Sequence, residues 1–209
     1  MGDDRLVNVL ADRTKFSTDT VIGIDNGCTG TVALFHNGEL VDFFEQFSYK
    51  WRKPHVKKRN SYMSRIDYER LSKWLTMVKL SYDSVIAVIE RPMTDETRLQ
   101  QTISSHHAQE AVMIALESHG IPFMTVDSSE WQKRYLEGVS GSKLLKKSSM
   151  DRASSEYPKF CEVVTSHGDG DAIYIARMVV DGSTEFVPDF QRMPFVEGKM
   201  KKRKFITNF

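Results

Sequence analysis

The stretch VIGIDNGCTGTVALF, residues 21–35, decides the fold prediction because it holds two apolar runs separated by a glycine-rich turn. β-branched residues dominate the first run, which predicts a buried strand over 20–25. The glycines end that strand, and the second run predicts another over 31–36. Asp25 stands at the end of the first strand. It either forms the turn or belongs to a carboxylate set whose other members lie far along the chain.

The composition predicts a soluble globular protein of one domain. The chain has 209 residues, of which 40% are hydrophobic and 27% charged, and no apolar run approaches the roughly 20 residues of a membrane span. The start MGDDR lacks the layout of a secretory signal. Two cysteines are too few for a disulfide framework or a cysteine zinc site, so a cytoplasmic location is expected.

The net charge of +1 hides a segregation of the basic residues. The segment from Lys50 to Arg65 holds seven Lys or Arg and no acid, and KMKKRK at 199–204 adds five. Aromatic residues alternate with the first run, which therefore predicts a basic loop that contacts phosphates and stacks on bases. A solvated loop and a frayed tail are the alternatives. The DNA-binding residues expected in this loop are Lys50, Arg52, Lys53, Lys57, Lys58 and Arg59.

The remaining pattern predicts a mixed sheet covered by helices. An Asn-Gly turn predicts a third, antiparallel strand over 40–44. Further strands are expected over 84–90 and 122–126, and helices over 66–80, 100–119, 143–156 and 169–180, with one or two helical turns after residue 127. Three antiparallel hairpin strands followed by parallel strands place ligands at the carboxyl ends of the parallel strands.

Acidic residues mark the ends of these elements. Asp25 and Glu90 end predicted strands, and SHGDGDAIYIARM supplies Asp169 and Asp171 at the start of a predicted helix. Oxygen ligands of this kind suit Mg²⁺. Helical residues two apart point about 200° away from one another, so at most one of the two aspartates is expected to face the site. Asp171 is the favoured metal ligand of the two. Asp169 fits the N-cap position, from which it could still reach a metal, and His167 is a third candidate ligand.

Each acid also has a structural alternative. Asp25 precedes Asn-Gly and could only form a turn, Glu90 could pair with Arg91, and Asp171 could stabilise a helix dipole. Three apolar elements that each begin or end on an acid are less easily accidental than any one of them. The pattern therefore favours a metal site over three separate structural acids.

Four stretches carry a resemblance to a known family. In order they are IGIDNGCTGTVALF, VIAVIERP, DSSEWQKRYLEGVSG with a following lysine cluster, and HGDGDAIYIARM. Their order and spacing resemble the RuvC-like Holliday junction resolvases of the RNase H-like superfamily, closest in style to those encoded by phages and viruses. The resemblance spans about residues 21–180. It implies an RNase H-like fold, a homodimer acting on four-way DNA, and two Mg²⁺ or Mn²⁺ ions held by Asp25, Glu90, Asp171 and a neighbour.

This sequence departs from the family pattern at the fourth ligand. The family carries an acid or histidine three positions before the last aspartate, where this chain has Gly168. Asp169 or His167 could replace it. The acidic site residues expected on this basis, for both metal binding and catalysis, are Asp25, Glu90, Asp169 and Asp171.

The resemblance also implies roles for lysines and a reaction. Family lysines follow the third parallel strand, which here points to Lys133 and to one of Lys143, Lys146 or Lys147. Lys143 is the one assigned to catalysis, and a solvated helix face is the alternative. Residues assigned to DNA binding outside the basic loop are Gln100, Lys133, Lys146 and Lys147. The implied reaction is two-metal hydrolysis of Holliday junctions and other branched DNA, which leaves nicks with a 5′ phosphate. Trp131 is expected to pack rather than to stack on a base.

Three other functions remain open at this stage. One is a broader debranching nuclease for flaps and forks, and another is a branched-DNA-binding module without hydrolysis. GIDNGCTGT also resembles the phosphate loop of actin-like ATPases, but those need two such domains, so no nucleotide cofactor is expected. A homodimer without membrane contact is expected, with 100–119 as a candidate dimer face. The expected division is a polar leader over 1–18, a nuclease domain over 19–182 with a basic insertion at 49–65, and a basic tail over 183–209.

Overall fold

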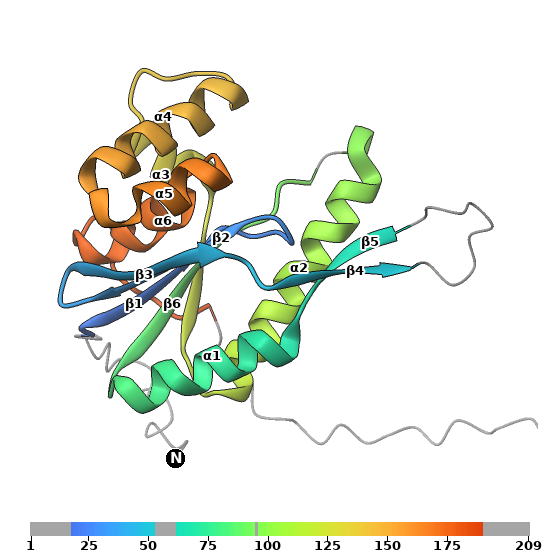
Figure 1. Cartoon of the computed structure of the whole chain (residues 1–209), viewed down its shortest axis with the longest axis vertical. Helices are drawn as coiled ribbons and strands as arrows, with labels where there is room; N and C mark the ends of the chain where they lie inside the picture. The colour runs from blue at the N-terminus through green and yellow to red at the C-terminus, as the bar shows by residue number, and fades with distance from the viewer. Residues whose placement is uncertain (1–17, 53–61, 95, 190–209) are drawn as a thin grey trace, which may run out of the picture.

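A five-stranded sheet in the order β3-β2-β1-β6-β7 lies at the centre of the protein, as a computed structural model shows (Figure 1). The structure describes residues 18–52, 62–94 and 96–189. Strands β1, β2 and β3 pair antiparallel, and β6 and β7 run parallel to β1. The predicted mixed sheet, with three antiparallel hairpin strands followed by parallel strands and with flanking helices, is confirmed. The strands are β1 (Thr20–Ile24), β2 (Thr31–His36), β3 (Glu39–Glu45), β6 (Val85–Glu90) and β7 (Phe123–Val126).

Helices cover both faces of this sheet because its central strands are apolar on both sides. In β1, Val21 packs in the cluster of α3 to α6, whereas Ile22 and Ile24 pack in the cluster of α1 and α2. Figure 1 shows α3 to α6 gathered on one side of the sheet, away from α1. The helices are α1 (Tyr68–Ser81), α2 (Leu99–Ser118), α3 (Ser128–Tyr135), α4 (Ser142–Glu156), α5 (Cys161–His167) and α6 (Asp171–Val180), with 3₁₀ turns η2 (Glu96–Arg98) and η3 (Pro158–Phe160).

The contact between β1 and α6 is unusually close because Gly23 has no side chain. A Cβ atom at this position would collide with the backbone oxygen of Ala172 and with the Cβ atom of Ala176. Helix α6 therefore lies directly on the strand. This approach brings the first residue of α6 to the carboxyl end of β1.

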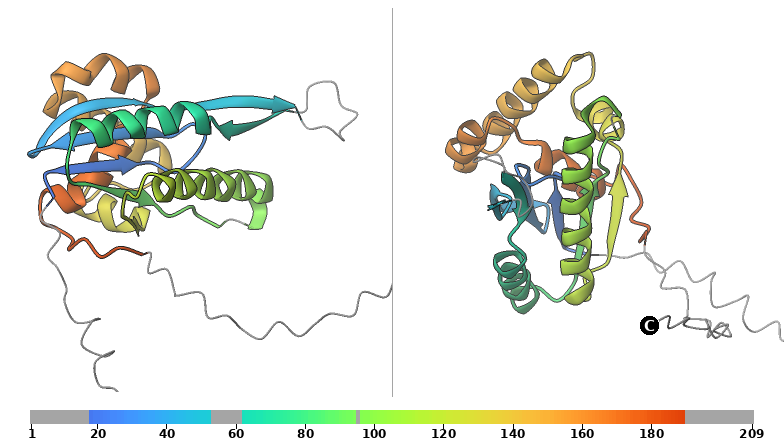
Figure 2. Two further views of the ribbon diagram at one scale, coloured as in Figure 1. Left: turned by 90° about the horizontal axis from the view of Figure 1, so that it is seen from below. Right: turned by 90° about the vertical axis from the view of Figure 1, so that its right-hand side faces the viewer.

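Both described ends of the segment predicted to be a basic loop are strands instead. Strands β4 (Ser48–Arg52) and β5 (Tyr62–Ile66) pair antiparallel as a separate two-stranded sheet, which extends beyond the central sheet (Figure 2). The expected loop was wrong because the run of charges hides an alternation of aromatic residues that favours strands. The basic residues Lys53, Lys57, Lys58 and Arg59 lie outside the described residues.

Two helix starts and one whole helix also differ from the sequence prediction. Helix α1 begins after Asp67, whose side chain accepts a hydrogen bond from the backbone N–H of Arg70, while Ile66 still belongs to β5. Helix α5 was not predicted, since its seven residues are too few for a clear period. Helix α6 begins at Asp171 rather than Asp169. The shift at α6 matters most for the site.

The chain after α6 returns to the outer edge of the sheet. The Asp189 carboxylate accepts hydrogen bonds from the Thr125 backbone at 2.6 Å and from the Thr125 hydroxyl at 2.5 Å, and the Asp189 N–H donates to the Phe123 carbonyl at 3.0 Å. The opposite edge of β7 pairs with β6. Within the described ranges, no helix is both long and apolar enough to cross a membrane.

Candidate metal centre

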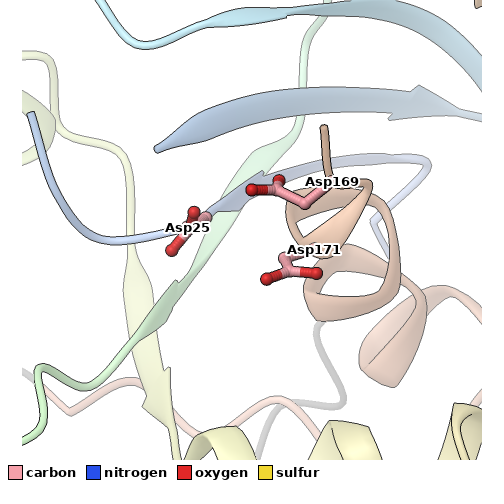
Figure 3. A group of neighbouring side chains, drawn as sticks. All are labelled: Asp25, Asp169 and Asp171. Carbon is pink, nitrogen blue, oxygen red and sulfur yellow. The ribbon is translucent and has the colours of Figure 1, made fainter. Parts of the chain in front are cut away.

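Three aspartates from distant parts of the chain meet at one end of the sheet. Asp25 follows β1, and Asp169 and Asp171 lie at the start of α6 (Figure 3). One carboxylate oxygen from each lies within 4.8 Å of the others, so the group could hold a metal ion. The expectation that only one of the last two faces the site was wrong. Asp169 precedes the helix, so helical geometry does not turn it away.

A tight turn holds Asp25 at this position. Its backbone N–H donates to the Thr31 carbonyl at 3.0 Å. A Cβ atom at Gly30 would lie 3.0 Å from the Asp25 Oδ2 atom and would collide with the Asp25 carbonyl oxygen. The turn thus needs glycine, and it leaves the Asp25 carboxylate directed at the other two aspartates rather than bound within the turn.

Glu90 lies beside this group because its strand neighbours β1. Ile86 and Val88 of β6 pack in the same apolar cluster as α6. Side chains two residues apart on a strand lie on the same face, so Glu90 also lies on the face that α6 covers. Asp25, Glu90 and Lys146 line one cavity of about 450 Å³, called here the acidic cavity. Glu90 is outside the set of three closest carboxylates, yet its charge reaches Asp25.

Burial and mutual repulsion disfavour the ionised form of these acids. Burial, followed by the charges of Glu90 and Asp171, raises the pKa of Asp25. Burial and then the Asp171 charge raise the pKa of Glu90 to about 7. Burial and then the Asp169 charge raise the pKa of Asp171 to about 6. A divalent cation would relieve this repulsion, so the electrostatics of the site fit a metal.

Asp169 is the exception among the four acids. Its side chain is 1% exposed, and its Oδ2 atom lies 3.1 Å from Lys146 Nζ and 3.4 Å from His167 Nε2. Burial raises the pKa of Asp169, but the hydrogen bond from His167 and the Lys146 charge lower it by more. The Oδ1 atom is buried and has no hydrogen-bond partner among the described residues. An ionised carboxylate with one anchored and one unpaired oxygen fits a metal ligand.

His167 lies behind Asp169. Its Nδ1 atom is 3.4 Å from the Glu45 Oε1 atom of β3, and its Nε2 atom is 3.4 Å from Asp169. The hydrogen bond to Asp169 raises the pKa of His167. Both ring nitrogens therefore face carboxylates. Of the two candidates for the fourth ligand, Asp169 and His167, only Asp169 belongs to the group of three carboxylates within 4.8 Å of one another.

Ser149 is a site residue that the sequence analysis did not identify. Its hydroxyl donates to Asp171 Oδ1 at 2.5 Å and accepts from the Gly170 N–H at 3.2 Å. Lys146 and Ser149 are three apart on α4, so they share a face of that helix. The i, i+3 spacing of Ser149 from Lys146 was the sequence feature that could have indicated a role for Ser149.

The other predicted residues lie away from the carboxylates. Lys143 and Lys147 are exposed on α4 and Lys133 on α3, and none of the described contacts joins them to the site. Gln100 is the second residue of α2, and its neighbour Gln101 lines the acidic cavity. The predicted DNA-binding residues Lys50 and Arg52 are exposed on β4. Trp131 is buried, as its expected packing role requires.

Together, the mixed sheet and the carboxylates at the carboxyl end of its central strands define a candidate metal centre. No family model matches the sequence, and no curated protein matches it. Among solved structures, T. thermophilus RuvC in complex with a Holliday junction substrate aligns with a TM-score of 0.44 at 14% identity, covering 77% of this chain and 96% of that chain. Another structure of Thermus thermophilus RuvC aligns with a TM-score of 0.40 at 14% identity, covering 77% of this chain and 97% of that chain.

Proposed function

We propose that this protein is a metal-dependent endonuclease that hydrolyses phosphodiesters in branched DNA, including four-way junctions. The observation that carries the proposal is the convergence of Asp25, Asp169 and Asp171, with Glu90 and Lys146 beside them. Hard oxygen donors of this number suit Mg²⁺ or Mn²⁺. The order of motifs along the chain, which resembles RuvC-like resolvases, favours DNA as the substrate.

The fit of the site to divalent cations rests on its chemistry. Asp25, Asp169 and Asp171 would hold the metal, and Glu90 would complete a second position. When bound, divalent cations lower the pKa of water and neutralise charge on a phosphodiester. The four acids otherwise repel one another, and this repulsion adds to burial in raising the pKa values of Asp25, Glu90 and Asp171.

Lys146 has the position to act on the substrate directly. Its ammonium group lines the acidic cavity next to Asp169. Burial lowers the pKa of Lys146, but Asp169 raises it by more, so the side chain stays protonated at neutral pH. We expect it to bind a phosphate oxygen as charge develops there. The expected product is a nick with a 5′ phosphate.

The basic hairpin would hold the DNA outside the cavity. Lys50 and Arg52 of β4 and Arg65 of β5 are exposed and suited to phosphate contacts. In this proposal the protein acts as a homodimer whose two sites cut opposed strands, with α2 as a candidate dimer face. Its setting would be the cytoplasm of a bacterial cell, which a phage-encoded nuclease would share.

A cleavage panel tests the proposal. A mobile four-way junction, a flap, a fork and linear duplex would be incubated with Mg²⁺ and with the wild type, Asp25→Asn or Glu90→Gln. We expect the wild type to cut the junction and both variants to lose at least about 100-fold in rate. Asp151→Asn, on the exposed side of α4, is the matched control and should cut normally.

Each contrary result has a distinct meaning. Cleavage of flaps and forks in preference to the junction would indicate a broader debranching nuclease. Junction binding without cleavage by the wild type would indicate a DNA-binding module. Full activity in both site variants would show that the carboxylates are not the catalytic centre.

A further inference from the structure

A second cavity lies between β5 and the first half of α2. It has a volume of about 480 Å³ and is called here the hairpin groove. Its apolar walls are Tyr62 and Met63 on one side and Leu99 and Ile103 on the other. The rest of its lining is polar and consists of Gln100, Gln101, Ser104 and His107.

The apolar walls of the groove are open to solvent. Leu99 is 62% exposed, Tyr62 is 52% exposed and Ile103 is 44% exposed. Large apolar side chains that gather in one exposed groove are typical of a binding surface. Tyr62 belongs to the basic segment whose aromatic residues predict base stacking, whereas no sequence pattern indicated the facing wall on α2.

The hairpin groove adjoins the acidic cavity. Gln101 lines both cavities, and the next residue, Thr102, lines the acidic cavity. A molecule whose phosphate occupies the acidic cavity would therefore have its neighbouring atoms at the mouth of the groove. The occupant of the groove is thus expected to be part of the same substrate.

The charge around the groove selects a polyanion. Strands β4 and β5 carry Lys50, Arg52 and Arg65, all exposed, and neither strand contains an acid. Arg52 pairs directly with Tyr62 across the hairpin, so a cation flanks the aromatic wall. An apolar slot with a cationic rim suits a nucleotide, whose base is flat and apolar on its faces and whose backbone is anionic.

We propose that the hairpin groove binds an unpaired nucleobase of the DNA substrate next to the cleaved phosphodiester. Base faces are covered by stacking in a continuous duplex and become available at a branch point or in a single strand. The groove would thus favour branched over linear DNA. This inference rests on the proposed function and deepens it, because it assigns the selectivity to a surface separate from the carboxylates.

Two isoleucines of α2 provide the test. Ile103 lines the groove, whereas Ile114 lies on the same helix outside it, and the two are 44% and 47% exposed. The full-length wild type, Ile103→Ser and Ile114→Ser would be titrated with a fluorescent four-way junction and with linear duplex of equal length, in Ca²⁺ to prevent cleavage. Tyr62→Ser is a second groove variant, on the exposed hairpin. Thermal unfolding would check that each variant is folded.

The expected result is a change in selectivity. Ile103→Ser and Tyr62→Ser should lower the ratio of junction to duplex affinity about tenfold, while Ile114→Ser keeps the wild-type ratio. An unchanged ratio in both groove variants overturns the inference and leaves the proposed function standing if the wild type still cuts junctions. An unchanged ratio together with a shift from dimer to monomer in sedimentation would assign the groove to a second copy of the chain. A wild type that neither binds nor cuts the junction would overturn both proposals.

Discussion

The Ser149 hydroxyl donates a 2.5 Å hydrogen bond to Asp171, and both side chains are buried. One turn earlier on the same helix, Lys146 contacts Asp169. Helix α4 thus contacts both Asp169, which precedes α6, and Asp171, which is its first residue. The geometry of the candidate metal centre depends on α4 as well as on the sheet.

Replacement of Ser149 by alanine should weaken metal binding. Asp171 would lose the donor that orients it and that lowers its pKa against the effect of burial. We expect the Kd for Mn²⁺ to rise about tenfold, as for other residues that orient metal ligands. Titration followed by electron paramagnetic resonance measures this directly. Ser148→Ala, one position earlier on α4, should bind Mn²⁺ as the wild type does, and equal affinities in both variants would contradict the assigned role.

His167 should influence the metal through Asp169. His167→Ala removes one of the two groups that hold Asp169 Oδ2, whereas Glu45→Gln only weakens the orientation of the imidazole. The expected order of Mn²⁺ affinity is wild type, then Glu45→Gln, then His167→Ala. His106→Ala, exposed on α2, is the control. Complete loss of binding in His167→Ala, as large as in Asp25→Asn, would instead identify His167 as a ligand.

The metal-free protein should lose stability as the pH rises. Folding raises the pKa of Glu90 from 4.5 to about 7 and that of Asp171 from 3.8 to about 6. A carboxyl with a raised pKa binds its proton more tightly in the folded state, so its stabilising effect is complete below the unfolded value and is lost as the pH rises through the folded value. The unfolding temperature in EDTA should therefore fall between about pH 4 and pH 7.

Glu90→Gln should remove part of this loss. At pH 8 in EDTA, the variant should be about 1–3 kcal/mol more stable than the wild type, and Mg²⁺ should stabilise the wild type more than the variant. Glu110→Gln, on the exposed side of α2, should leave the pH profile unchanged. A wild-type profile in Glu90→Gln would show that Glu90 contributes nothing to the repulsion.

The lysines of α4 should differ sharply in their effect on the reaction. Lys146 contacts Asp169, whereas Lys143 and Lys147 are exposed and make none of the described contacts with the site. With saturating Mg²⁺ and four-way junction DNA, Lys146→Gln should lower kcat about 100-fold, and Lys143→Gln and Lys147→Gln should lower it less than about threefold. A larger loss in Lys143→Gln than in Lys146→Gln would support the assignment made from the sequence.

The sequence predicted the strand ends of the site better than its helices. Asp25 and Glu90 end short, continuous apolar runs that are typical of buried strands, so their place at the carboxyl edge of the sheet could be inferred. Ser149 and Lys146 could not be assigned in this way, because their direction depends on the phase of α4, where polar residues hide any period. The β4–β5 hairpin was missed for a similar reason, since charges dominate its composition.

The bonds between Asp189 and Thr125 have a consequence for self-association. The N–H and carbonyl groups at the outer edge of β7 would otherwise offer a template for a further strand, from a second copy or from an aggregating chain. With this edge satisfied from within the chain, the sheet cannot lengthen there. The segment from α6 to Asp189 thus protects this edge of the sheet against the addition of a further strand.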